Sequence, residues 1–348
     1  MENQEKIDEL QAEIYALGDQ IVGFFHELFA VVGENTLKVA ITNSRGVVVG
    51  YDDYSIGSLQ KKLQLRPPCG HRHQGLIKSG STPCYRRSVT SFGGTMASDI
   101  FNEYCGLFIE QQYDITDYDY DLEVIQPMLD HTKRAVGPSD VYHDLLLDDM
   151  ADFVQNPHMR APHVWVIMGG QGSGKSSLMD VAFVPIYGCD DPEANNWHGV
   201  GRGLYVSFHD SFQVLREKFG DPSFGRKIIV FDDEQGNGDL YQRRGALKNF
   251  ISTNFRILES KNVTAKMAKE YSQLFILTND FNVVDLEDIQ QRRYIIVEMN
   301  GSMRGNKAYF DRLFALGKSE AFCLIWFKFL MSRDLTKHNR VQPQPAPD

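Results

Sequence analysis

The sequence is poor in cysteine and lacks a long apolar run. Its 348 residues include five cysteines, an odd number spread thinly over the chain, which excludes a disulfide scaffold and favours a reducing compartment. The most apolar stretches, residues 21–32 and 321–331, are interrupted by charged side chains and fall short of the ~18 apolar residues that a membrane span needs. No charged-then-apolar signal sequence opens the chain. We therefore expect a soluble protein without a membrane partner.

Positive charge is outnumbered by negative charge, and it is unevenly placed. The chain has 36 basic and 46 acidic residues, a net charge of −10, which argues against a protein that holds nucleic acid on a broadly basic surface. Residues 60–97 nevertheless carry seven basic and no acidic side chains, whereas residues 110–152 carry twelve acids and two basic residues. Any contact with nucleic acid is therefore expected to be local.

The N-terminal part of the chain shows three separate patterns. Apolar residues at alternating steps of three and four over residues 7–28 predict a helix with coiled-coil spacing or, alternatively, a helix packed on its own domain. β-Branched residues on both sides of Asn43-Ser-Arg-Gly predict a hairpin within residues 34–57. The Pro-, Gly- and Ser-rich stretch 60–97 predicts a loop. We expect residues 1–98 to form a smaller mixed or helical domain for oligomerisation, as a collar, or for nucleic-acid binding.

Beyond residue 160, short apolar strands alternate with helical segments, which is typical of a layered α/β domain. A helix is expected from just after Pro138 to just before Pro157. The predicted strands are residues 164–168, 203–208, 227–231, 274–278 and 294–297. We therefore divide residues 99–348 into a helical lead-in over 99–157, an α/β core over 158–305, closing helices over 306–335 and a disordered tail over 336–348.

A phosphate-loop motif directly follows the first of these strands. Gly169-Gly-Gln-Gly-Ser-Gly-Lys-Ser176 fits G-x-x-x-x-G-K-[ST]. Glycines let successive backbone N–H groups surround a phosphate, and the next helix offers its positive N-terminus. Lys175 is expected to neutralise the β/γ charge and Ser176 to ligate Mg²⁺; the alternative is a glycine-rich turn without nucleotide. The predicted ATP-binding residues are Gly169, Gly170, Gln171, Gly172, Ser173, Gly174, Lys175, Ser176 and Ser177.

Three consecutive acids end the strand over residues 227–231. A phosphate loop needs a carboxylate at the end of a neighbouring strand to hold the Mg²⁺ shell, and a second group to polarise the attacking water. We assign Asp232 to the metal and Asp233 to the base, with Glu234 as a substitute because three adjacent acids leave the register ambiguous. The alternative is a solvated strand end.

An amide and two arginines complete the candidate catalytic set. Asn279 ends the strand over 274–278, where its amide can hydrogen-bond the γ-phosphate and the lytic water, although such a residue is more often a turn former. Arg292 and Arg293 precede the next strand, and a guanidinium there can complete the ATP site of a neighbouring subunit as an arginine finger. Arginines beside a strand are mostly solvated, so this assignment depends on the whole set.

The order of these motifs resembles that of the superfamily 3 helicases of the AAA+ class. The likeness covers roughly residues 140–300 and is closest to the helicase part of poxvirus- and phage-type primase-helicases. It implies an AAA+ P-loop NTPase fold, a homohexameric ring with ATP between subunits, and movement along a single strand, typically 3′ to 5′. It also implies a channel hairpin before the strand of Asn279, which places the nucleic-acid contacts at Lys261 and Asn262; a surface lysine is the alternative for Lys261. Arg293 is preferred to Arg292 as the finger, because it directly precedes the aromatic Tyr294.

The chain departs from such fusion proteins in its N-terminal part. Residues 1–98 contain no recognisable primase motif, so a separate primase or polymerase is expected as a partner. Cys69, His71, His73 and Cys84 have the side chains of a zinc site but not the usual knuckle spacing, so they are either zinc ligands or ordinary loop residues. The expected location is the cytoplasm or a replication site in a host cell.

Taken together, the residues and the resemblance predict an ATP- and Mg²⁺-dependent hexameric helicase that acts on single-stranded DNA in the replication of a virus or mobile element. RNA is the alternative substrate. A P-loop ATPase that acts as a switch or packaging motor without strand separation is the main alternative function. A small-molecule kinase and an inactive relative kept for binding are weaker alternatives, since neither explains the full motif set.

Overall fold

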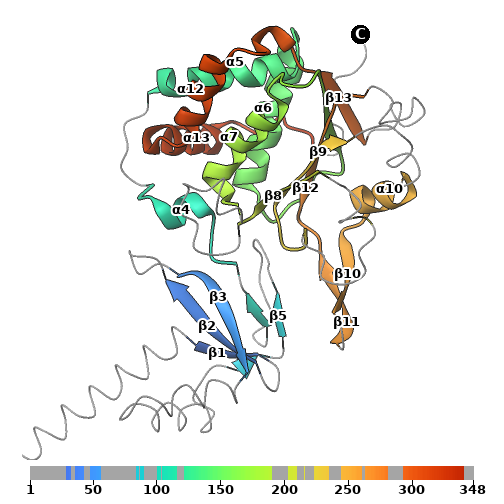
Figure 1. Cartoon of the computed structure of the whole chain (residues 1–348). Coiled ribbons are helices and arrows are strands. Elements are labelled where there is room, and N and C mark those ends of the chain that lie inside the picture. Colours follow the sequence, from blue (N-terminus) through green and yellow to red (C-terminus); the bar gives the residue numbers. More distant parts are fainter. Residues whose placement is uncertain are drawn as a thin grey trace, which may run out of the picture. The chain divides into compact units, whose positions relative to one another are not determined.

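The computed structural model describes most of the chain and divides it into two compact units, Met1–Cys105 and Gly106–Asp348. The sequence predicts a boundary at residue 98. Figure 1 shows the elements of each unit. The described residues are 29–32, 36–42, 48–55, 84–85, 87–89, 100–102, 104–115, 121–189, 203–209, 215, 223–234, 244–260, 263–280 and 293–340.

The described residues of the first unit form β-strands, except for Tyr104 and Cys105 at its end. One sheet has the order β3-β2-β1-β4, and a second pairs β5 with β6 in parallel. The predicted hairpin is confirmed, because β2 and β3 pair antiparallel with Thr36 opposite Ser55. The predicted heptad helix lies outside the described residues. The strands are β1 (Phe29–Val32), β2 (Thr36–Thr42), β3 (Val48–Ser55), β4 (Cys84–Tyr85), β5 (Arg87–Val89) and β6 (Ile100–Asn102).

Two details of the sequence prediction are wrong in this unit. Strands β4 and β5 lie within the stretch predicted as a loop, and β6 lies at the start of the predicted helical lead-in. Ile100 and Phe101 are residue types that favour strands, so local propensity agrees with β6. The candidate zinc ligands Cys69, His71 and His73 lie outside the described residues, as does the side chain of Cys84.

The second unit contains a five-stranded parallel sheet with the order β13-β7-β12-β9-β8. All five strands overlap the stretches predicted from the sequence. Strand β12 lies between β7 and β9, so the carboxyl end of β12 separates those of the phosphate-loop strand and the acid strand. The strands are β7 (Val164–Met168), β8 (Tyr205–Phe208), β9 (Ile228–Glu234), β12 (Gln273–Thr278) and β13 (Tyr294–Glu298).

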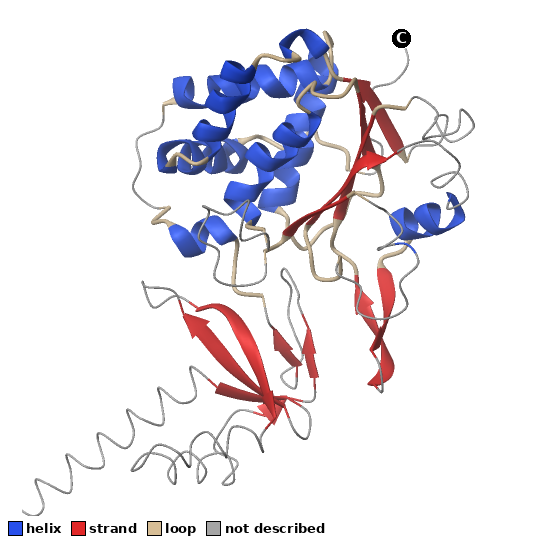
Figure 2. Ribbon diagram, viewed as in Figure 1, coloured by secondary structure: helices blue, strands red, loops and turns tan. Residues whose placement is uncertain are grey.

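The two faces of this sheet pack on different layers, as Figure 2 shows. In β7, Trp165 and Ile167 face the larger apolar core, whereas Val164 and Val166 face a smaller one that includes Leu247 of α10. This alternation follows from the two-residue period of a strand. Because both faces are covered, the central strands β7 and β12 consist mainly of apolar residues, as buried parallel strands do.

The larger layer is helical, and α7 lies at its centre. All but two of the thirteen residues of α7 are buried, and Trp326 of α13 donates a hydrogen bond of 3.0 Å to the carbonyl of Ala182 in α7. Among the described residues no helix combines the length and the apolar content that a membrane crossing requires. The helices are α4 (Phe108–Gln112), α5 (Gln126–Ala135), α6 (Asp140–Gln155), α7 (Lys175–Tyr187), α10 (Arg244–Ser252), α12 (Lys307–Gly317) and α13 (Glu320–Ser332), with 3₁₀ turns η1 (Leu122–Ile125) and η2 (Gly301–Met303).

Part of the acidic stretch 110–152 forms ion pairs within the fold, from helix α6. Asp148 accepts hydrogen bonds of 2.8 and 2.6 Å from Arg333, and the nearly buried carboxylate of Asp152 pairs with Arg340. These ion pairs fasten the segment after α13 to α6. Part of the net negative charge is therefore neutralised within the fold.

Candidate nucleotide-binding site

The glycine-rich loop after β7 leads directly into α7. Gly174 is the N-cap of this helix and has φ +106°, a conformation that is readily available only to glycine. A side chain at this position would also collide with its surroundings, since a Cβ would lie 2.8 Å from both His131 and Phe310. The loop therefore has the glycine that its backbone requires, and the first turn of α7 presents its N–H groups toward the loop.

Lys175 joins the loop to the neighbouring strand. Its Nζ donates hydrogen bonds to the carbonyl of Gly169 at 2.6 Å and to Oδ1 of Asn279 at 2.8 Å. Asn279 follows the carboxyl end of β12, which pairs in parallel with β7. The sheet thus brings together two predicted site residues that lie more than a hundred positions apart in the sequence.

Asp232 approaches the loop from the next strand. Its Oδ2 accepts a hydrogen bond of 2.8 Å from the hydroxyl of Ser176. Pairing of β9 with β12 shifts register here: Ile276 is opposite Phe231, but Thr278 is opposite Glu234. One extra residue on β9 makes a β-bulge, a feature that re-aims side chains beside functional sites.

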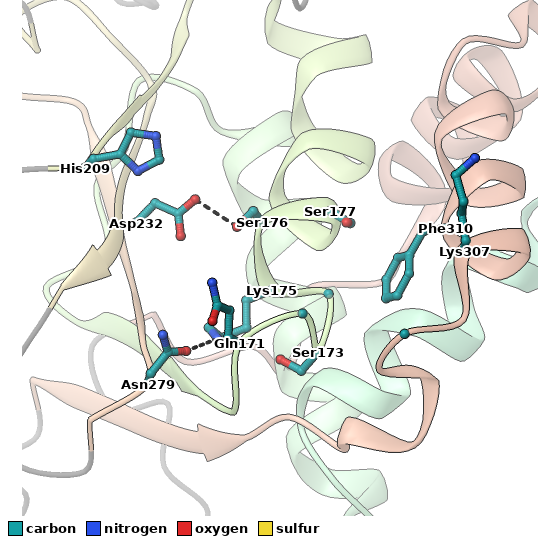
Figure 3. A pocket seen from close by; sticks show the side chains of 13 residues that line it. Gln171, Ser173, Lys175, Ser176, Ser177, His209, Asp232, Asn279, Lys307 and Phe310 are labelled. Carbon is teal, nitrogen blue, oxygen red and sulfur yellow. Dashed lines mark hydrogen bonds between the residues drawn. The ribbon is translucent and has the colours of Figure 1, made fainter.

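These side chains border one cavity of about 520 Å³. Figure 3 shows Asn279, Asp232 and His209 on one side of the loop and Phe310 on the other. Ser173 is 2% exposed, and its hydroxyl has no hydrogen-bond partner in the described structure. The lining residues are Gln171, Gly172, Ser173, Gly174, Lys175, Ser176, Ser177, His209, Asp232, Asn279, Gly305, Lys307 and Phe310.

The donor set fits Mg²⁺. This ion takes oxygen ligands at about 2.1 Å in octahedral geometry, so two adjacent ligands lie about 3 Å apart. Ser176 Oγ and Asp232 Oδ2 are 2.8 Å apart, close to that spacing. A hydroxyl from the loop and a carboxylate from a neighbouring strand are also the pair that holds Mg²⁺ in P-loop NTPases.

Several lining residues come from positions that the sequence motifs do not mark. Gly305, Lys307 and Phe310 border the cavity from the start of α12, and His209 borders it from the end of β8. Arg304 lies over the loop as well, since a Cβ on Gly170 would be 3.5 Å from its Nη1. The sequence gives no signal for these residues, because they come from other elements and have no fixed sequence spacing from the loop.

Arg293 lies away from this cavity. It immediately precedes β13, and its carbonyl accepts a hydrogen bond of 2.7 Å from Val164 at the start of β7. The loop, by contrast, follows the other end of β7. A five-residue strand spans about 16 Å, so Arg293 and the phosphate loop lie at opposite ends of the parallel strands. Arg293 is therefore not brought to the phosphate loop of its own chain.

The predicted hairpin is present as a two-stranded antiparallel ribbon, β10 (Phe255–Ser260) and β11 (Val263–Lys269). At its base, Arg256 forms an ion pair with the buried Glu270 and lies 4.2 Å from the ring centroid of Phe250. Further out, the opposed side chains of Ile257 and Met267 are 69% and 68% exposed. The ribbon is thus fixed at its base and projects from the sheet, as Figure 1 shows.

The remaining predicted site residues lie outside what the structure describes. Lys261 and Asn262 fall between β10 and β11, and Arg292 precedes the described start at Arg293. Asp233 and Glu234 belong to β9 through their backbone, but their side chains are not described.

Comparison with known proteins supports the fold. Three apo structures of the NrS-1 C-terminal region match with TM-scores of 0.59, 0.58 and 0.54 and identities of 16%, 15% and 14%. The matches cover 89%, 89% and 87% of this chain and 69%, 69% and 67% of those chains. Together with the parallel sheet and the loop, they define an α/β fold of the P-loop NTPase type.

A family model described as a family of unknown function (DUF5906) matches residues 167–293. This span begins within β7, includes the phosphate loop, the acid strand, the ribbon and Asn279, and ends at Arg293. No curated protein sequence gives a significant match.

Proposed function

We propose that this protein is an ATP-dependent helicase or translocase of the superfamily 3, AAA+ type, which moves along single-stranded DNA as a homohexamer. The observation that carries the proposal is the joint contact of the loop with two neighbouring strands: Ser176 with Asp232, and Lys175 with Asn279. A glycine-rich turn that binds no nucleotide does not explain why a lysine, a hydroxyl, a carboxylate and an amide surround one cavity.

In this proposal each group has a separate task in ATP hydrolysis. The loop N–H groups and Lys175 bind the β- and γ-phosphates, and Ser176 and Asp232 hold Mg²⁺. The ion, when bound, neutralises the charge that develops on the phosphate oxygens. Asp233, or Glu234 in its place, accepts a proton from the attacking water, and Asn279 orients that water and the γ-phosphate.

The position of Arg293 supports a site shared between subunits. Its distance from its own phosphate loop excludes a contact within one chain but suits an arginine finger that reaches the ATP of a neighbour. Arg292 is the alternative finger. In a closed ring every subunit presents the same two surfaces, so each ATP receives one such arginine.

The ribbon β10–β11 supports a contact with a single strand. Lys261 and Asn262 connect the two strands of the ribbon in the sequence, and in this proposal the Lys261 cation contacts phosphates without reading bases. Six copies around a channel would concentrate positive potential in a protein whose net charge is −10. We propose single-stranded DNA as the substrate, RNA as the alternative, and a role in replicating a virus or mobile element beside a separate primase or polymerase.

Hydrolysis of Mg·ATP by the purified protein tests the enzymatic part of this proposal. We expect Lys175→Ala to lower kcat at least about 100-fold, because it removes a charge that stabilises the transition state. The matched control is Lys318→Ala, an exposed lysine between α12 and α13, which should hydrolyse ATP like the wild type. Equal hydrolysis by the Lys175→Ala variant and the wild type would contradict the proposal.

A further inference from the structure

We infer that His131 and Tyr309 are positioning residues of the nucleotide site. His131 lies on α5, Tyr309 on α12 and the phosphate loop between them in the sequence, so the three segments are far apart along the chain. This inference rests on the proposed function, because it concerns how the loop is held for a nucleotide phosphate.

The contact is a chain of hydrogen bonds through one buried imidazole. His131 is 1% exposed; its Nε2 lies 3.1 Å from the carbonyl of Gly174, and its Nδ1 lies 2.8 Å from the hydroxyl of Tyr309. A carbonyl only accepts, so Nε2 carries the proton and donates. Nδ1 therefore accepts from the Tyr309 hydroxyl. Burial lowers the pKa of His131 to about 4, which keeps this neutral tautomer in place at neutral pH.

The bridge of hydrogen bonds from Tyr309 through His131 to the Gly174 carbonyl fixes the direction of the backbone N–H of Lys175, which we expect to bind phosphate. The peptide bond between Gly174 and Lys175 is planar and trans, so the Lys175 N–H points opposite to the Gly174 carbonyl. The same carbonyl accepts the first helical bond of α7, from Leu178 at 3.0 Å. By holding the carbonyl toward α5, His131 turns the Lys175 N–H away from α5, toward the cavity.

The bridge adds a side-chain restraint to a peptide unit that the helical bond from Leu178 also holds. Gly174 has a conformation that few residues adopt, and glycine itself imposes no preference for it. The rings of His131, Tyr309 and Phe310 pack against one another, with 5.2 Å between the centroids of Tyr309 and Phe310. Because Phe310 borders the cavity, the bridge also ties the α12 wall to the loop.

The expected consequence is a loss of nucleotide affinity with little change in turnover. The N–H of Lys175 contacts a phosphate in both the ground state and the transition state, and the loss of such uniform binding raises KM without lowering kcat. A role confined to stability would lower Tm and leave both the Kd for nucleotide and KM unchanged.

The test is titration of the full-length protein with Mg·ADP by calorimetry, together with ATP hydrolysis and thermal unfolding. His131→Leu should weaken ADP binding roughly tenfold, since it removes both hydrogen bonds. His131→Gln should restore most of the affinity, because its amide can donate to Gly174 and accept from Tyr309. Tyr309→Phe should weaken binding about threefold, the cost of one hydrogen bond, and add little in the His131→Leu background.

Tyr142→Phe, on a half-buried tyrosine of α6, is the matched control and should bind ADP like the wild type. Two results would overturn the inference while leaving the proposed function intact: normal ADP affinity in both His131→Leu and Tyr309→Phe, or equal damage in His131→Leu and His131→Gln. Absence of ADP binding by the wild type would overturn the proposed function itself and the inference with it.

Discussion

At the scale of single residues, the candidate site combines groups that the sequence marks with groups that it does not. Lys175, Ser176 and Asp232 follow from local motifs, because a phosphate loop and an acid-tipped strand each occupy one short stretch. His131 contacts Gly174 at a separation of 43 residues and Tyr309 at a separation of 178. Such partners are set by tertiary packing, and no local pattern predicts them.

The buried imidazole of His131 makes stability depend on pH. Burial lowers its pKa from 6.5 to about 4, so the unfolded chain binds this proton at a higher pH than the folded one. The contribution to stability is complete above pH 6.5 and is lost as the pH falls toward 4. We expect the wild type to lose about 2 kcal/mol from this group between pH 7 and pH 5.

Urea unfolding at the two pH values measures this loss. The variant His131→Gln has no titrating group at this position and should lose correspondingly less stability over the same interval. If the two proteins lose stability in parallel between pH 7 and pH 5, the imidazole is not held neutral in the folded state.

At the scale of helices and strands, the sequence predicts the sheet well because its strands are short, apolar and separated by turn residues. Helix α6 also ends where expected, at Gln155 before Pro157, since a proline disfavours helix in the residue before it. The order of the strands is a different matter. Nothing local in the sequence places β12 between β7 and β9, yet this order brings Asn279 to Lys175.

The segment after α13 gives a prediction at this scale. Arg340 pairs with Asp152, whose side chain is 4% exposed. Removing the arginine therefore leaves a nearly buried carboxylate with the neutral Asn156 amide as its side-chain donor and without its ion-pair partner. We expect Arg340→Gln to lower the free energy of unfolding by about 2 kcal/mol, less than for a fully buried pair because Arg340 is partly exposed. Lys337→Gln, on an exposed lysine of the same segment, should change it by less than about 0.5 kcal/mol. Chemical denaturation measures the free energy of unfolding of both variants. Equal values for the two would show that the ion pair contributes nothing to stability.

At the scale of the whole molecule, the proposed ATP site is incomplete within one chain. The phosphate loop lies at the carboxyl ends of the parallel strands, and Arg293 lies at their amino ends. The candidate finger therefore does not reach the ATP that its own subunit would bind. The strand directions place Arg293 and the loop at opposite ends of β7, and sequence spacing alone does not give those directions.

Mixing two inactive variants tests whether the site is shared. Asp232→Asn removes the candidate metal ligand and Arg293→Ala the candidate finger, and each alone should have little ATPase activity. In a mixed ring, a subunit with Arg293→Ala keeps an intact loop and can receive the arginine of a neighbour that carries Asp232→Asn. We therefore expect the mixture to regain part of the activity, measured as ATP hydrolysis against mixing ratio. A mixture no more active than the average of its components would argue against a finger in trans.

Stimulation of ATP hydrolysis by nucleic acid would distinguish a translocase from other P-loop ATPases. The rate is measured for the wild type and for Lys261→Ala without nucleic acid, with single-stranded DNA and with single-stranded RNA, and Lys318→Ala serves as the control. We expect single-stranded DNA to raise the wild-type and control rates, and Lys261→Ala to abolish this stimulation while sparing the basal rate. A wild-type rate that neither polymer changes would contradict a translocase and favour a switch or packaging motor.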